Sequence, residues 1–156
     1  MFTKDRSFRI ALVNTLYFTI GVVPITMAIS LGLAILMNKP LKGRTFFRSV
    51  LFFPYVASLV AIAVVWMALF NPDRGPVNNI LIALGVSKPP RWAASQTWAL
   101  PTIIGLTIWK GMGYYMIVYL AALQGVSRDL YEAASLDGAN KWQQFVNITW
   151  PCVTPT

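Results

Sequence analysis

The sequence has no histidine, a single cysteine and only five acidic residues among 156. Without histidine it has no imidazole for a catalytic triad, for acid–base chemistry or for a zinc-binding helix. Its one cysteine, Cys152, excludes an intrachain disulfide and leaves the redox compartment open. The sequence also lacks the glycine-rich phosphate loop of proteins that bind and split ATP. We therefore expect no catalytic site, no metal site and no cofactor.

Charged residues of either sign are scarce. They make up 12% of the chain against 56% hydrophobic residues, whereas soluble domains carry about a quarter charged residues. Three stretches contain no Asp, Glu, Lys or Arg: 10–38, 49–72 and 92–109. Each stretch is long enough to cross about 30 Å of hydrocarbon as a helix. The composition predicts an all-α, polytopic membrane helix bundle with spans at about 11–37, 49–71 and 98–123.

The basic residues give a formal net charge of +8, but they are scattered around the apolar stretches and form no single stripe. This distribution indicates membrane-flanking charge and no nucleic-acid binding. One short loop holds four of them without an acid, which predicts that this loop is cytoplasmic: Lys39, Lys42, Arg44 and Arg48. The segment 73–96 has turn signals around a short apolar piece at 80–84, which predicts an external loop with an interfacial helix.

The most polar stretch, "YEAASLDGANKWQQFVNITWP" at 131–151, follows the third predicted span. Ser127 can cap a helix that begins at Arg128, and Asp137-Gly138 can end it because glycine accepts a left-handed backbone. A second helix is predicted over about 139–149, with Pro151 as its stop. Periodicity alone leaves two interpretations open: an ordinary interfacial hairpin, or an element that docks a partner.

Particular residues of this stretch match a known pattern. The segment "EAASLDGANKWQQFVNITWP" resembles the EAA loop of permease subunits in binding-protein-dependent ABC importers. The resemblance continues upstream through "MNKPLKGRTFFRSVLFFPY" and "WKGMGYYM" and covers essentially the whole chain, in the manner of the carbohydrate-type permeases. It implies that the loop at about 127–151 couples to an ATPase through these residues: Glu132, Ala133, Ala134, Asp137, Gly138 and Ala139.

The resemblance also implies a function and a setting. The chain is expected to move a sugar or related small polar solute and to catalyse nothing itself, with ATP hydrolysed on another chain. The implied partners are a second permease subunit, an ABC ATPase dimer, an extracytoplasmic solute-binding protein and the lipid bilayer, with no nucleic acid. The implied location is the cell (inner) membrane of a bacterium or archaeon, as a multi-pass protein.

Lys110 lies deep in the third predicted span, where an ionisable group is costly. Two interpretations stand: it faces a wet cavity, or it pairs with a neighbouring helix for structure. Gly111 and Gly113 beside it are expected to loosen the helix there. By position, the resemblance implies a solute path along these residues: Tyr55, Leu59, Thr107, Lys110, Gly111 and Tyr114.

Two other functions compete with transport. One is a small membrane scaffold or assembly protein whose 127–151 hairpin only docks a partner, and the other is a membrane enzyme, which the missing histidines disfavour. Residues 1–156 are expected to form one transmembrane permease domain, incomplete at both ends. The final "PCVTPT" stops inside the resembling pattern, so we expect roughly the second to fourth of six core spans, with Met1 outside.

Overall fold

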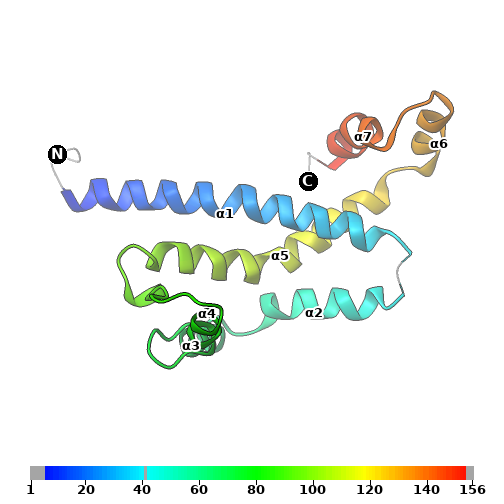
Figure 1. The fold of residues 1–156 in the computed structure, drawn as a ribbon. Helices are drawn as coiled ribbons and strands as arrows, with labels where there is room; N and C mark the ends of the chain where they lie inside the picture. The colour runs from blue at the N-terminus through cyan, green and yellow to red at the C-terminus, as the bar shows by residue number, and fades with distance from the viewer. Residues whose placement is uncertain (1–5, 41, 154–156) are drawn as a thin grey trace. The chain divides into compact units, whose positions relative to one another are not determined.

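The computed structural model describes residues 6–40 and 42–153, and these residues form helices and turns without a strand (Figure 1). The predicted all-α class is confirmed. In chain order the elements are α1 (Arg6–Asn38), α2 (Arg44–Val56), α3 (Leu59–Leu69), α4 (Pro76–Ala83), the 3-10 turn η1 (Trp92–Ala94), α5 (Ala99–Gly125), α6 (Arg128–Leu136), α7 (Lys141–Gln144), the π-helical turn η2 (Phe145–Thr149) and α8 (Trp150–Val153).

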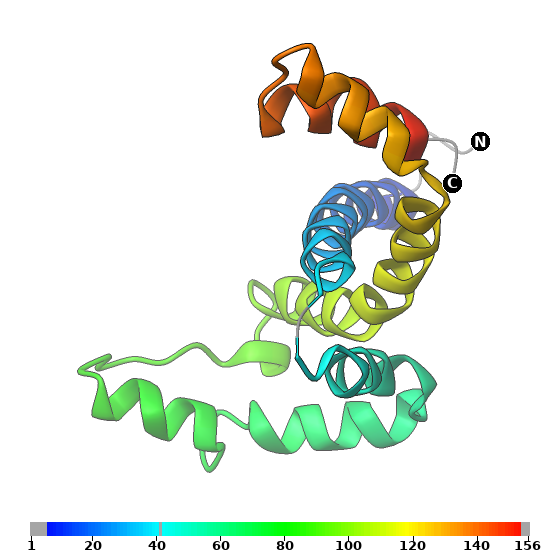
Figure 2. The same ribbon diagram turned by 90° about the vertical axis from the view of Figure 1, so that its right-hand side faces the viewer.

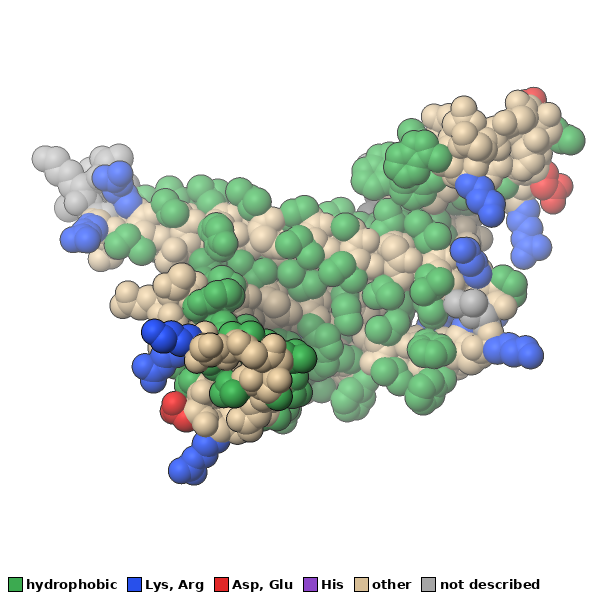
Figure 3. Space-filling view, viewed as in Figure 1, with side chains coloured by type: hydrophobic (Ala, Val, Ile, Leu, Met, Phe, Trp, Pro, Cys, Tyr) green, Lys and Arg blue, Asp and Glu red, His purple; other side chains and the backbone are tan. Residues whose placement is uncertain are grey.

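Two of the described helices, α1 and α5, are long and apolar enough to cross a membrane. The pair α2 and α3 makes a third candidate if the two are counted as one broken span. Hydrophobic side chains cover much of the visible surface of these helices, and Lys and Arg gather near the helix ends (Figure 3). This pattern is the one expected of helices that face lipid along their length and water at their ends.

The segment predicted as one span at 49–71 is divided in the structure. α2 ends at Val56, α3 begins at Leu59, and the two helices are bent by 98° at the break (Figure 2). At Ser58 the backbone leaves the helical region, with φ −54° and ψ 129°. Pro54, inside the last turn of α2, lacks an N–H and weakens the helix that it belongs to. The break therefore lies where the helix has already lost a hydrogen bond.

α5 is unbroken, although Gly111 and Gly113 were expected to loosen it. Gly113 has a different role, which is to let two backbones approach. A Cβ atom at Gly113 would lie 2.6 Å from the carbonyl carbon of Leu51 and 3.0 Å from Cα of Phe52. A small residue at such a crossing is what allows close helix packing in a membrane.

The chain forms two compact units, each considered by itself, and one comprises Met27–Phe52 and Met112–Thr156. Its core joins α1, α5 and α8 through six buried side chains: Ala34, Met37, Met116, Leu120, Leu123 and Val153. The Ser30 hydroxyl donates a 3.0 Å hydrogen bond to the carbonyl of Met112. Apolar packing of α1 against α5, with one polar tie, thus supports the helix from which the 127–151 loop departs.

The other unit comprises Met1–Thr26 and Phe53–Gly111, and its loop is organised around Asn78. This buried amide donates to the carbonyls of Pro72 (2.9 Å) and Pro90 (3.3 Å) and accepts from Trp92 Nε1 (2.6 Å). The ring of Phe70 lies 4.9 Å from that of Trp92. The helix expected near 80–84 is present as α4, which carries Asn78. A single side chain therefore ties together the two proline-rich turns of this loop.

Replacement of Gly113 by Ala is expected to destabilise the protein, because the added Cβ would collide with the backbone of α2. The expected loss is about 1–3 kcal/mol in the free energy of unfolding, the usual cost of overpacking. Gly105→Ala on the same helix is the matched control, since nothing lies within 4 Å of a Cβ there, and it should gain up to about 1 kcal/mol from helix propensity. Thermal unfolding in detergent measures both, and equal midpoints for the two variants would contradict the close crossing.

Candidate coupling loop and solute path

The 127–151 loop begins with a capped helix, as predicted. Ser127 stands at the N-cap of α6, and its hydroxyl accepts a hydrogen bond from the N–H of Asp129 at 3.3 Å. Asp129 itself lies in the first turn, where its charge is favourable at the positive end of the helix dipole. The local sequence therefore fixes where α6 starts.

The predicted turn at Asp137-Gly138 is also present. Gly138 has φ +79°, in the left-handed region that glycine adopts without strain. Its N–H donates to the carbonyl of Ser135 at 3.2 Å, and the N–H of Ala139 donates to that of Ala134 at 2.9 Å. These two bonds form the Schellman motif, which satisfies the last carbonyls of α6 while reversing the chain.

The second arm begins with Asn140, in a capping box with Gln143. Each side chain accepts from the other's backbone N–H, at 2.8 and 2.9 Å. The arm continues as α7, η2 and α8 to Val153, so the expectation that Pro151 stops it is wrong. In the π-helical turn, Trp150 N–H bonds the carbonyl of Phe145, five residues back. This wider turn accommodates the proline, which would clash with a carbonyl four residues back in a regular helix.

Side-chain hydrogen bonds join the two arms. Gln144 Nε2 donates to Ser135 Oγ at 2.9 Å and to the carbonyl of Ala139 at 3.3 Å. The hydroxyls of Tyr131 and Thr149 lie 2.9 Å apart and share a hydrogen bond. Caps at both helix starts and hydrogen bonds between the arms thus hold the two arms of the loop together.

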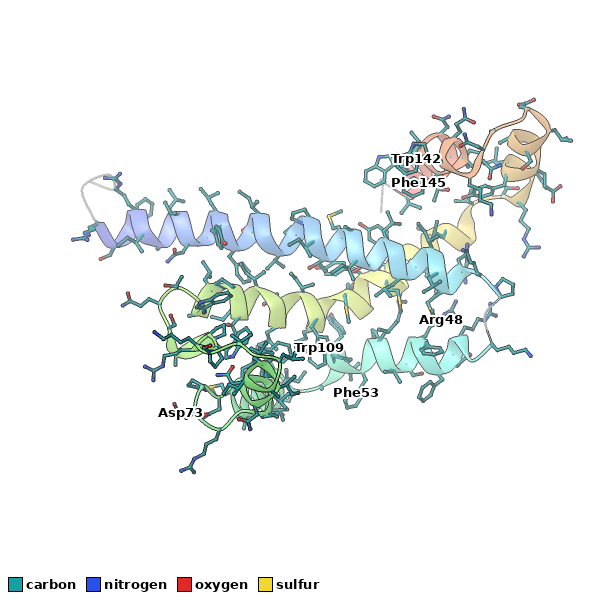
Figure 4. The ribbon with its side chains drawn as sticks, viewed as in Figure 1. Arg48, Phe53, Asp73, Trp109, Trp142 and Phe145 are labelled. Carbon is teal, nitrogen blue, oxygen red and sulfur yellow. The ribbon has the colours of Figure 1, made fainter. Side chains whose placement is uncertain are left out.

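The outer surface of the loop carries most of the predicted coupling residues. Glu132, Ala133, Asp137 and Gly138 are exposed, and Ala134 and Ala139 are half-buried. Leu136 is 90% exposed and Trp142 is 71% exposed, with the Trp142 ring stacked 5.6 Å from that of Phe145 (Figure 4). The residues predicted for coupling did not include Leu136. Its apolar character at the last position of a polar helix was the available signal.

Among the predicted path residues, Lys110 and Tyr55 contact one another. Lys110 Nζ donates to the carbonyls of Tyr55 (2.8 Å), Pro54 (3.1 Å) and Ala57 (3.1 Å). It also lies 5.7 Å from the centroid of the Tyr55 ring. Of the two interpretations of Lys110, this geometry supports pairing with a neighbouring helix.

The remaining path residues are distributed along α3 and α5. Leu59 is the first residue of α3 and is exposed, and Gly111 is half-buried inside α5. The Thr107 hydroxyl donates to the carbonyl of Ile103 at 2.8 Å. Tyr114 follows Lys110 by four residues along α5, belongs to the other unit, and has its ring 5.3 Å from that of Tyr115. Within the described residues no group of His, Cys, Asp or Glu is arranged to hold a metal ion.

Similar proteins agree on one family. The lactose transport system permease protein LacF of Rhizobium radiobacter is 41% identical over 97% of this chain and 51% of its own length. The sn-glycerol-3-phosphate permease protein UgpA of Yersinia pestis is 32% identical over 97% of this chain and 51% of its own. The chain thus spans about half the length of these relatives.

A solved structure gives the same result. A chain of a bacterial ABC transporter involved in the import of the acidic polysaccharide alginate superposes with a TM-score of 0.87 and 32% identity, over 98% of this chain and 54% of that one. The family described as the inner membrane component of binding-protein-dependent transport systems matches residues 10–156. The chain belongs to this family of membrane permease components.

Proposed function

We propose that the chain is part of the permease subunit of an ABC importer that moves a sugar or a related small polar solute across a bacterial or archaeal inner membrane. It works with a second permease, an ABC ATPase dimer and a solute-binding protein. The names of its relatives support this, since they are transport permeases for lactose and glycerol phosphate, and one related structure holds a periplasmic protein with bound alginate pentasaccharide.

The observation that carries the proposal is the 127–151 loop, a helical hairpin with hydrogen bonds between its arms after a long apolar helix. In this proposal the exposed residues of the hairpin contact the ATPase, and Glu132 pairs with a basic or polar group there. Because α6 follows α5 after Gly125 with a single short turn, displacement of the hairpin is transmitted to the spanning helices. Such a two-state element, biased by a ligand at a distance, is what coupled transport requires.

The solute path of the proposal follows Tyr55, Leu59, Thr107, Gly111 and Tyr114, with Lys110 beside it. Tyrosine offers an apolar ring face and a hydroxyl, which suit the apolar face and hydroxyl edge of a sugar. The proposal is tested with the full-length permease and its partner subunits in vesicles, supplied with labelled lactose, sn-glycerol 3-phosphate and an arabino-oligosaccharide. ATP-dependent uptake of at least one of these solutes supports the proposal. Absence of ATP-dependent uptake of all three contradicts it and favours a scaffold.

Replacement of Gly138 by Val should abolish coupled uptake while the protein remains in the membrane. A β-branched residue at φ +79° costs about 1–2 kcal/mol or more and spoils the Schellman turn. Gly138→Asn, which tolerates this backbone, should keep most of the uptake. Uptake per amount of inserted permease is the measurement.

The matched control is Gly85→Val, which places the same strain at φ +93° in the loop before α5. That variant is expected to retain ATP-dependent uptake. If Gly138→Val transports normally, or if Gly85→Val uncouples to the same degree, the hairpin is not the coupling element.

Thr107 and Tyr114 are expected to line the path. After replacement of Cys152 by Ala, cysteines placed at 107 and 114 should react with a water-soluble thiol reagent, and a transported solute should slow the reaction. A cysteine at Leu120, which is 3% exposed in the core, serves as the unreactive control. Absence of labelling at both 107 and 114 would place this face of α5 against lipid or another helix.

A further inference from the structure

Lys110 donates to three of the four carbonyl groups of residues 54–57, at the end of α2 and just after it: those of Pro54, Tyr55 and Ala57. We infer that Lys110 is a positioning residue: its ammonium group caps the end of α2, holds the break between α2 and α3, and fixes Tyr55, and it does not itself bind solute. The number of donors equals the number of carbonyls that accept from them, because an ammonium group has three N–H donors and no acceptor.

The carbonyls need these donors because of the break. In a continuous helix, the carbonyls of residues 54–57 would accept from the amides of 58–61. Here the helical bonds run from Ala57 N–H to Phe53 on one side and from Ile62 N–H to Ser58 on the other. The carbonyls between them are left to other donors, and an unpaired backbone group inside a bilayer is costly.

Charge favours the same arrangement. The C-terminal end of a helix carries partial negative charge, which a lysine compensates. The Tyr55 ring adds a cation–π contact at 5.7 Å. One ammonium therefore engages Tyr55 through both its backbone and its ring, which restricts the orientation of that side chain.

This geometry excludes direct recognition of an acidic solute by Lys110 as it stands. All three of its N–H groups are directed to carbonyls, so an anion could bind only by breaking the cap. The effect of Lys110 on transport would therefore pass through Tyr55. That last step rests on the proposed function, whereas the cap itself does not.

Hydrogen exchange at the break tests the cap. In the full-length permease in detergent, Lys110→Met should speed exchange of the Ala57 and Ile62 amides at least fivefold, because the carbonyls beside them lose their donors. Lys110→Arg, which keeps several N–H donors, should stay within twofold of wild type. Lys88→Met, an exposed lysine of the same unit, is the matched control and should change nothing at the break.

Unchanged or slower exchange in Lys110→Met overturns the inference. Should that variant fail to accumulate, Lys110→Leu, which also has no N–H donor, takes its place, and wild-type exchange at the break would again overturn the inference. Exchange of the Asn79 amide, which donates to the Gly75 carbonyl at the start of α4, reports whether the fold survives. If Lys110→Arg behaves like Lys110→Met, the site requires the shape of lysine and not its donors, and the inference is wrong.

Uptake separates positioning from solute contact. Lys110→Met should lower uptake of whichever of neutral lactose and anionic sn-glycerol 3-phosphate the wild type transports. Where it transports both, the two factors should agree within threefold. A loss confined to the anionic solute would show direct contact and overturn the positioning role. If wild type transports neither, the proposed function fails, while the exchange experiment still decides the cap.

Discussion

A backbone N–H or C=O group in the hydrocarbon region has no water to bond, so every departure from helix there must bring its own partner. The break between α2 and α3 meets this demand with the ammonium group of Lys110, at the cost of a charge inside an apolar segment. The helix that carries the lysine, α5, is itself unbroken, and Gly113 lets the backbone of α2 approach it closely.

The 127–151 loop is built by different rules because its chain is polar. Its ends are closed by a Ser127 cap, a Schellman turn at Gly138 and an Asn140 capping box, all of which use local sequence. Side-chain bonds from Gln144 and Tyr131 then join the arms. Because these hydrogen bonds hold the two arms together, apolar residues such as Leu136 can remain exposed for a partner.

The features that the sequence predicted are those that depend on nearby residues, and most of the features it missed depend on distant contacts. Apolar runs without charge predicted the long helices, and short-range signals at Ser127 and Gly138 predicted the cap and the turn. The break after Val56 was missed because Pro54 alone does not end a membrane helix, and the donors from Lys110, more than fifty residues away, appear in no local pattern. Gly113 was interpreted as loosening α5 when its role is steric, and Pro151 was taken for a stop because a π-helical turn is not visible in periodicity.

Coupled transport, as proposed, depends most on contact between the 127–151 hairpin and the ATPase. A photo-reactive benzoyl-phenylalanine at position 136, which is 90% exposed at the end of α6, tests that contact in the full-length permease assembled with its partners. We expect a cross-link from position 136 to the ATPase subunit, and none from position 84, which is 76% exposed after α4. No cross-link at 136, or an equal one at 84, would contradict the proposed contact.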